Sequence, residues 1–194
     1  MIAKAIIAIL PLSFASVVSS QTNEFTNIRN AGAFPCEDVV NSLQSPGNET
    51  EKTAFLQWTA GFSTAASRAN SLTDVFPITD TWTMLEMVAL VCNEDSSSTF
   101  EAAVRLTIAR LRPYWVRDET AIFRLSDPSG KTVQIYGAVI PRIQQKLRDI
   151  GFQLEADGIF GNQTGNALRL LGEKSGIEPL MVPTGKYWYI LTRP

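Results

Sequence analysis

The chain has 194 residues, of which 45% are hydrophobic and 19% are charged, and its formal net charge is −2 at pH 7. This composition excludes a disordered polar tail and fits one globular domain or two small ones. Nucleic-acid-binding proteins carry an excess of basic residues, which this chain does not have. The chain also contains no histidine, and this excludes serine–histidine triads and histidine-ligated zinc.

The first twenty residues predict a secretory signal peptide. A segment with Lys4 precedes an apolar run over residues 5–18, and small residues follow before Gln21. The alternative, a membrane anchor, needs about 20 apolar residues, whereas this run is shorter and contains a proline. We therefore expect residues 1–20 to be removed on export to the periplasm or the exterior, which leaves no transmembrane anchor.

Cys36 and Cys92 are the only cysteines of the chain. In an oxidising compartment they have one possible pairing. Closing a loop of about 57 residues stabilises a domain by about 4 kcal/mol. We expect a structural disulfide, because this spacing does not favour a catalytic or metal-binding pair.

Four amphipathic helices are predicted between residues 34 and 115, because apolar side chains recur there at three- and four-residue steps. In chain order, these helices follow Pro35, cover residues 52–70, follow Asp80 as N-cap, and run from Ser98 as N-cap to Pro113. The pattern indicates a small bundle in which the disulfide ties the start of the first helix to the end of the third.

The order of Cys36, the segment FLQWTAGFSTAASRAN and the segment LVCNEDSSSTFEAAVRLTIARL resembles the HdeA-type family of small periplasmic proteins, which includes acid-stress chaperones. The resemblance covers residues 34–115 and implies a helical, disulfide-tied domain. Chaperone activity in that family depends on acid loosening a dimer through carboxylate protonation. Residues 34–115 hold ten acidic and five basic side chains, so this part would become strongly positive below pH about 4. That charge is compatible with an acid trigger and with unfolded proteins as clients.

Residues 116–136 predict a short hairpin or an ordered linker. Apolar side chains alternate with polar ones on both sides of the stretch Asp127-Pro128-Ser129-Gly130. Asp, Pro and Gly stand at the first, second and fourth positions of that stretch, as in a type I turn.

Residues 137–194 carry three further helical patterns. The first starts near Pro141 and ends at Gly151, the second ends at Gly176, and the third covers residues 184–192. Between the first two lies DGIFGNQTGNAL, which opens with a tight turn and then reverses the chain into the second helix. We expect four side chains of this part to lie in the core: Leu147, Phe152, Ile159 and Phe160.

The run RIQQKLRDIGF, followed by DGIFGNQTGNAL and a terminal aromatic segment, resembles the peptidoglycan-binding type 1 domain. The resemblance implies a three-helix module that attaches exported proteins to cell-wall peptidoglycan and catalyses nothing itself. One departure lies late in the second helix, where Leu170-Leu171-Gly172 stands in place of the family's aromatic–glutamine pair. This departure weakens the expectation that the chain shares the family's ligand contacts more than the expectation that it shares the family's fold.

Polar groups beside the turn are the candidates for contact with the wall. Amides and hydroxyls exchange hydrogen bonds with glycan and peptide groups, an aromatic face covers a sugar, and a cation pairs with stem-peptide carboxylates. The candidate ligand-binding residues are Asn162, Gln163 and Thr164, with Arg142, Gln145 and Trp188 as secondary candidates.

Carboxylate chemistry remains open to a chain without histidine, since glycoside hydrolysis needs only two Asp or Glu residues. The adjacent acidic pairs at 37–38, 94–95 and 118–119 lie at predicted helix ends or junctions, where such charges are usually solvated. We identify no catalytic residue, no metal site and no cofactor motif.

The predicted fold is therefore mainly α: a disulfide-tied four-helix bundle, a hairpin or linker, and a three-helix module over residues 137–194. The expected function is peptidoglycan binding by an exported, non-enzymatic cell-envelope protein, with other envelope proteins as further partners. Three alternatives stay open: a wall-tethered acid-stress chaperone, a carboxylate-dependent wall hydrolase, and reuse of the wall-binding fold for contacts with another protein.

Overall fold

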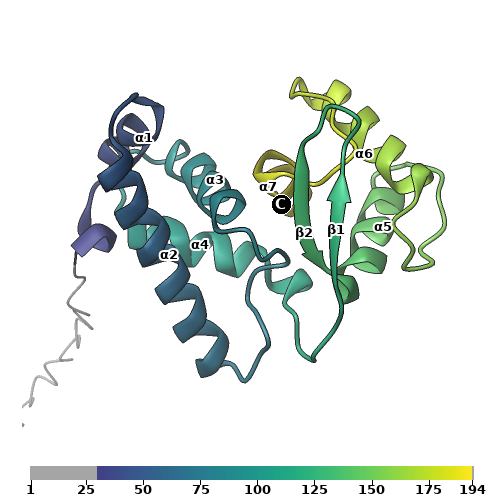
Figure 1. The fold of residues 1–194 in the computed structure, drawn as a ribbon, viewed down its shortest axis with the longest axis horizontal. Coiled ribbons are helices and arrows are strands. Elements are labelled where there is room, and N and C mark those ends of the chain that lie inside the picture. The colour runs from purple at the N-terminus through teal and green to yellow at the C-terminus, as the bar shows by residue number, and fades with distance from the viewer. Residues whose placement is uncertain (1–29, 194) are drawn as a thin grey trace, which may run out of the picture.

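A computed structural model describes residues 30–193, so the predicted signal segment lies outside the described residues. Figure 1 shows α1 to α4 together at one end, α5 and α6 at the other end and the hairpin between them, while α7 returns to contact α3. The α-helices are α1 (Cys36–Gln44), α2 (Glu49–Ala69), α3 (Thr81–Cys92), α4 (Phe100–Arg110), α5 (Ile140–Asp149), α6 (Asn162–Ser175) and α7 (Gly185–Thr192). The strands are β1 (Ile122–Ser126) and β2 (Thr132–Tyr136), and short 3-10 turns cover Asn30–Ala33, Arg112–Tyr114 and Gly137–Val139. The mainly α fold is thus confirmed.

Side-chain caps fix the starts of two helices in the first bundle. Asp80 caps α3 as predicted, because its carboxylate accepts the backbone N–H of Thr83 at 2.9 Å. The N-cap of α4 is Thr99, which accepts the N–H of Ala102 at 3.3 Å. The prediction of Ser98 was wrong by one residue, since the Ser98 hydroxyl donates instead to the carbonyl of Asp95 at 2.9 Å.

The predicted disulfide joins Cys36 to Cys92. It connects the first residue of α1 to the last residue of α3, and both cysteines are fully buried. The bond therefore links two ends of the bundle that are far apart in the sequence.

The hairpin pairs β1 and β2 antiparallel, with Phe123 opposite Ile135 and Leu125 opposite Val133. The N–H of Gly130 donates to the carbonyl of Asp127 at 2.9 Å, which closes the predicted turn. Here the structure confirms the hairpin.

The same hairpin packs against the first bundle. The N–H of Thr79 donates to the carbonyl of Gln134 at 3.1 Å, and the N–H of Tyr136 donates to the carbonyl of Pro77 at 3.2 Å. Ile78 and Ile135 bridge the two parts and are fully buried. Residues 116–136 therefore join the two halves of the molecule through a shared apolar core.

Helix α7 also contacts the first bundle, along α3. The backbone N–H of Gly185 donates to a carboxylate oxygen of Glu86 at 2.7 Å. The buried ring of Trp188 meets Tyr114 edge to face, with ring centroids 5.2 Å apart. Residues 137–193 thus contribute to one continuous core with α1–α4.

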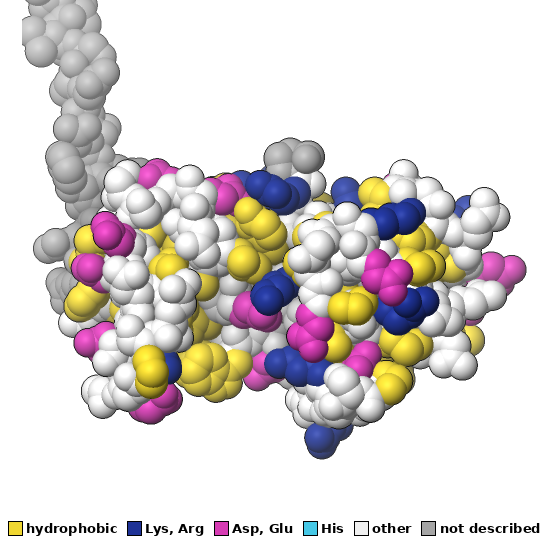
Figure 2. All heavy atoms as spheres, turned by 90° about the horizontal axis from the view of Figure 1, so that it is seen from above, with side chains coloured by type: hydrophobic (Ala, Val, Ile, Leu, Met, Phe, Trp, Pro, Cys, Tyr) yellow, Lys and Arg dark blue, Asp and Glu magenta, His cyan; other side chains and the backbone are white. Residues whose placement is uncertain are grey.

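The surface charge differs between the two halves. Residues 34–115 carry a net charge of −5 and residues 116–194 a net charge of +2. In Figure 2 the end that holds α1 and α2 shows acidic side chains with few basic ones, whereas both signs are mixed over the other half. No helix within residues 30–193 is long and apolar enough to cross a membrane.

Candidate functional site

A buried glutamine on α5 organises the loop between α5 and α6. The Gln144 side chain is 1% exposed. Its amide nitrogen lies 2.9 Å from a carboxylate oxygen of Asp157, 3.0 Å from the carbonyl oxygen of Ile159 and 3.0 Å from the hydroxyl oxygen of Thr164. Its amide oxygen accepts the N–H of Gly158 at 2.9 Å. One side chain thus holds both ends of the loop, and we call residues 157–164 the Gln144 loop.

Asp157 adds a second restraint to the Gln144 loop. The same carboxylate oxygen accepts the N–H of Ile159 at 2.9 Å, which forms a local turn, and Gly158 takes a positive φ of 76°. Hydrogen bonds from the N–H of Ile159 and then from the Gln144 amide hold the pKa of Asp157 below its usual range.

The Gln144 loop corrects one predicted core residue. Ile159 is 69% exposed, so the prediction that it is buried was wrong, whereas Leu147 is fully buried. Phe152 and Phe160 are partly buried and pack against the core. The Gln144 side chain occupies the inner side of the loop, where its amide donates a hydrogen bond to the carbonyl of Ile159. The Ile159 side chain therefore faces solvent.

A depression of about 410 Å³ lies beside this loop. We call it the loop groove, and its lining residues come from the end of α5, the segment after it and the first turn of α6: Arg148, Phe152, Gln153, Leu154, Glu155 and Gln163. Phe152 and Leu154 provide partly buried apolar surface, whereas the other four side chains are exposed. The groove therefore combines one cation, one carboxylate and two amides with an apolar surface.

The structure places two of the primary candidates on the surface and one inside. Asn162 and Gln163 are exposed in the first turn of α6, and Gln163 lines the loop groove. Thr164 is 1% exposed and is bonded to Gln144. The structure thus gives Thr164 a role in holding the loop.

The secondary candidates lie apart from the loop groove. Arg142 donates to the carbonyl of Trp115 at 2.7 Å, which ties α5 to the chain after α4. Gln145 is exposed and donates to Asp149 at 2.8 Å. Trp188 is fully buried, and its indole N–H has no hydrogen-bond partner among the described residues.

Five of the groove residues were not among the predicted candidates, and one of them, Phe152, was predicted only as a core residue: the five are Arg148, Phe152, Gln153, Leu154 and Glu155. Helical spacing was the available signal, since Gln144, Leu147 and Arg148 stand three and four residues apart on one side of α5. A glutamine between the buried Ile143 and Leu147 indicates a polar group that needs partners inside the fold.

The departure at Gly172 has a packing reason. A Cβ at this position would lie 2.3 Å from the hydroxyl oxygen of Tyr187. That hydroxyl accepts the N–H of Leu180 at 2.7 Å and donates to the carbonyl of Glu178 at 3.0 Å. A larger residue would therefore displace Tyr187 from the connection between α6 and α7.

Comparison of the chain with protein-family models, with curated proteins and with solved structures found no match.

Proposed function

We propose that this is an exported, non-enzymatic cell-envelope protein that binds peptidoglycan at the loop groove. The observation that carries the proposal is the loop held by Gln144, which presents Asn162 and Gln163 next to a depression that also contains Arg148. A fixed loop lowers the entropic cost of ordering these side chains on binding. The motif resemblance of residues 137–194 adds to this support.

The groove offers contacts for both parts of peptidoglycan. The Arg148 guanidinium can pair with a stem-peptide carboxylate, and the amides of Gln153 and Gln163 can exchange hydrogen bonds with peptide and acetamido groups. Leu154 and the part of Phe152 that faces the groove give an apolar surface for the carbon face of a sugar ring, while the Lys174 ammonium lies over the Phe152 ring at 4.7 Å from its centroid. Glu155 can accept hydrogen bonds from hydroxyl or amino groups.

The disulfide supports the exported location. Both cysteines are paired inside the core, and such bonds persist mainly in oxidising compartments. Export would bring the protein to the compartment where the wall polymer lies.

Sedimentation with insoluble peptidoglycan tests the proposal on the full chain, because α7 packs on α3 and a 137–194 fragment would lose that contact. Arg148→Ala and Gln163→Ala should each weaken binding by about five- to tenfold. Arg68→Ala near the end of α2 and Gln44→Ala at the end of α1 are matched controls, because they remove the same exposed groups far from the groove in sequence, and they should bind like the parent protein.

Two outcomes count against the proposal. If the parent protein stays in the supernatant like an unrelated protein, the function is wrong, and if the groove variants sediment like the controls, the site is wrong. Release of soluble muropeptides by the purified protein would contradict the non-enzymatic part and favour the hydrolase.

A second candidate function, acid-stress protection of unfolded proteins, is favoured by an open depression of about 410 Å³ on the first bundle. Its lining is mostly apolar and includes Phe62, Ile108 and Trp115, and such surfaces bind exposed apolar segments. This function predicts suppression of client aggregation at pH about 2 to 3 and none at neutral pH. Equal aggregation with and without the protein at low pH would exclude it.

A further inference from the structure

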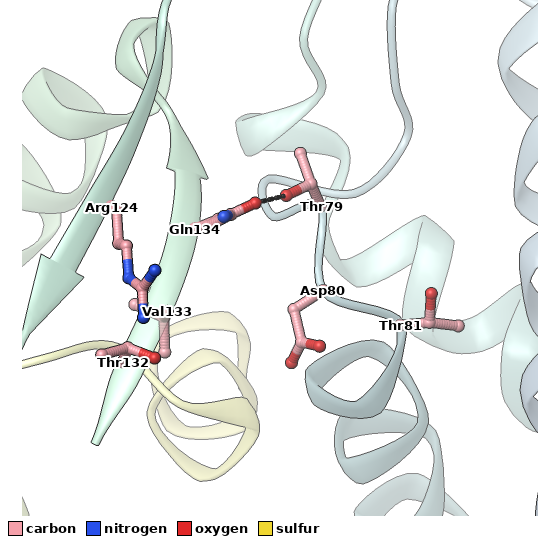
Figure 3. Close-up of a pocket in the computed structure, with 7 residues that line it drawn as sticks. All are labelled: Thr79, Asp80, Thr81, Arg124, Thr132, Val133 and Gln134. Atoms are coloured by element: carbon pink, nitrogen blue, oxygen red, sulfur yellow. Dashed lines mark hydrogen bonds between the residues drawn. The ribbon is translucent and has the colours of Figure 1, made fainter. Parts of the chain in front are cut away.

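Two neighbouring depressions lie at the start of α3. The first, of about 400 Å³, lies where the hairpin meets the residues that lead into α3, and its lining includes Arg124, Gln134 and Thr79. The Thr79 hydroxyl donates to the side-chain oxygen of Gln134 at 3.1 Å, so the two sides are joined there (Figure 3). The second, of about 370 Å³, lies between α2 and α3 and contains Gln57 and Trp82. Asp80 and Thr81 line both depressions, and we call the pair the Asp80 groove.

Trp82 is the aromatic surface of the Asp80 groove. Its side chain is 52% exposed, whereas Trp188 is buried and Trp58 and Trp115 are half-buried. About half of Trp82 stays exposed although helix α2 lines the same depression with four side chains: Thr53, Leu56, Gln57 and Ala60. A large aromatic group left in water beside polar residues is typical of a binding surface.

Polar groups with free bonding capacity line the Asp80 groove: Asp80 lines both depressions, and Arg124 lines the one next to that of Trp82. One oxygen of Asp80 caps α3 by accepting from the N–H and hydroxyl of Thr83, and the other has no donor among the described residues. Arg124 is exposed on β1 and forms no ion pair within residues 30–193. The Asp80 groove thus holds one free acceptor, one free set of donors and an aromatic face.

We infer that the Asp80 groove binds an uncharged pyranose oligosaccharide. The carbon face of one sugar ring stacks on Trp82, a hydroxyl donates to the free oxygen of Asp80, and oxygens further along the chain accept from Arg124. The charges of Asp80 and Arg124 cancel, so the groove is complementary to a neutral ligand that offers both donors and acceptors. An anionic sugar would be attracted by Arg124 and repelled by Asp80, so a negative charge adds no net attraction in this groove.

This inference goes beyond the proposed function, because the Asp80 groove shares no residue with the loop groove and does not depend on it. A polymer with sugar chains would engage both grooves, whereas a free neutral oligosaccharide would engage the Asp80 groove alone.

Calorimetric titration of the full chain with chitotetraose and with cellotetraose tests the inference. We expect saturable binding of at least one tetrasaccharide. Trp82→Ala should weaken it about tenfold or more, and Trp82→Phe, which keeps an aromatic face, by about threefold or less. Arg124→Ala should weaken it by about two- to fivefold. Phe34→Ala is the matched control, because Phe34 is an exposed aromatic residue in a different part of the bundle.

Absence of saturable binding by both tetrasaccharides would overturn the inference, as would parent-like affinity of folded Trp82→Ala. Circular dichroism establishes that each variant is folded, and Arg124→Ala provides a second test away from α3. Arg148→Ala separates the two proposals, because it should reduce peptidoglycan sedimentation and leave tetrasaccharide binding unchanged.

Discussion

The side-chain amide of Gln144 and the hydroxyl oxygen of Thr164 lie 3.0 Å apart, both buried, and join α5 to the first turn of α6. The same amide group also bonds the backbone of Gly158 and Ile159 on the inner side of the Gln144 loop. The positions of the surface residues Asn162 and Gln163 therefore depend on polar contacts in the core. Removing that contact should disturb both the stability of the protein and the shape of the loop.

Gln144→Leu tests this relationship. The substitution keeps a side chain of similar size but leaves the partly buried N–H of Gly158 and the buried Thr164 hydroxyl without their partner. We expect the free energy of unfolding to fall by about 1 to 3 kcal/mol, measured by urea denaturation. Amide hydrogen exchange should accelerate in residues 157–161.

The neighbouring Gln145→Leu is the control, because Gln145 is exposed and bonds only within α5. It should change the free energy of unfolding by no more than about 0.5 kcal/mol. Equal destabilisation by the two substitutions would show that Gln144 does not organise the loop.

The disulfide should supply a large part of the stability of the first bundle. Replacing Cys36 and Cys92 together by alanine should lower the free energy of unfolding by about 2 to 5 kcal/mol. Thermal unfolding of the parent protein with and without reductant checks the same point, and the double variant should not respond to reductant. An unchanged melting temperature on full reduction would contradict this expectation.

The ion pair of Glu94 and Arg110 should resist acid. Two hydrogen bonds, of 2.6 and 2.8 Å, connect the guanidinium to both carboxylate oxygens. Hydrogen bonding to Arg110 lowers the pKa of Glu94 from 4.5 to about 2. A carboxyl group with a depressed folded-state pKa stabilises the fold above its unfolded value and loses that contribution as the pH falls through its folded value.

Glu94→Gln should therefore destabilise the protein at neutral pH by up to about 1 kcal/mol, because the pair is partly exposed. The difference from the parent should shrink between pH 4.5 and about 2, as Glu94 becomes protonated in both states. Chemical denaturation across this range is the measurement, with the exposed Glu119→Gln as control. A difference that stays constant down to pH about 2 would contradict the role of Arg110.

Local patterns predicted the elements of the fold well. Helix ends depend on nearby chemistry, such as the Asp80 cap and the positive φ of Gly151 and Gly176, and these are visible in the sequence. The Ser98 cap was misplaced because Ser98 and Thr99 are adjacent and have equivalent hydroxyl groups. Contacts across the molecule, such as Gly185 with Glu86, have no local signal.

The candidate site was harder to predict for the same reason. A polar residue after a turn has the same pattern whether it faces solvent, as Gln163 does, or bonds a buried partner, as Thr164 does. Which of these occurs depends on Gln144, which lies 20 residues earlier in the chain. The exposure of Ile159 follows from the same contact, because apolar character alone does not reveal that a polar group fills the inner side of a loop.

Trp188 gives a test of how the two halves are coupled. Its ring is fully buried against Tyr114, so Trp188→Ala should lower the free energy of unfolding by about 3 to 5 kcal/mol. Trp188→Phe should cost less, because it keeps an aromatic ring and removes an indole N–H that has no partner among the described residues. Both variants should still bind peptidoglycan while folded, since the buried ring is not available to a polymer. If well-folded Trp188→Phe no longer sediments with peptidoglycan, Trp188 contributes to binding and this expectation is wrong. Two separate unfolding transitions in the parent protein would show that α7 does not couple the halves through α3.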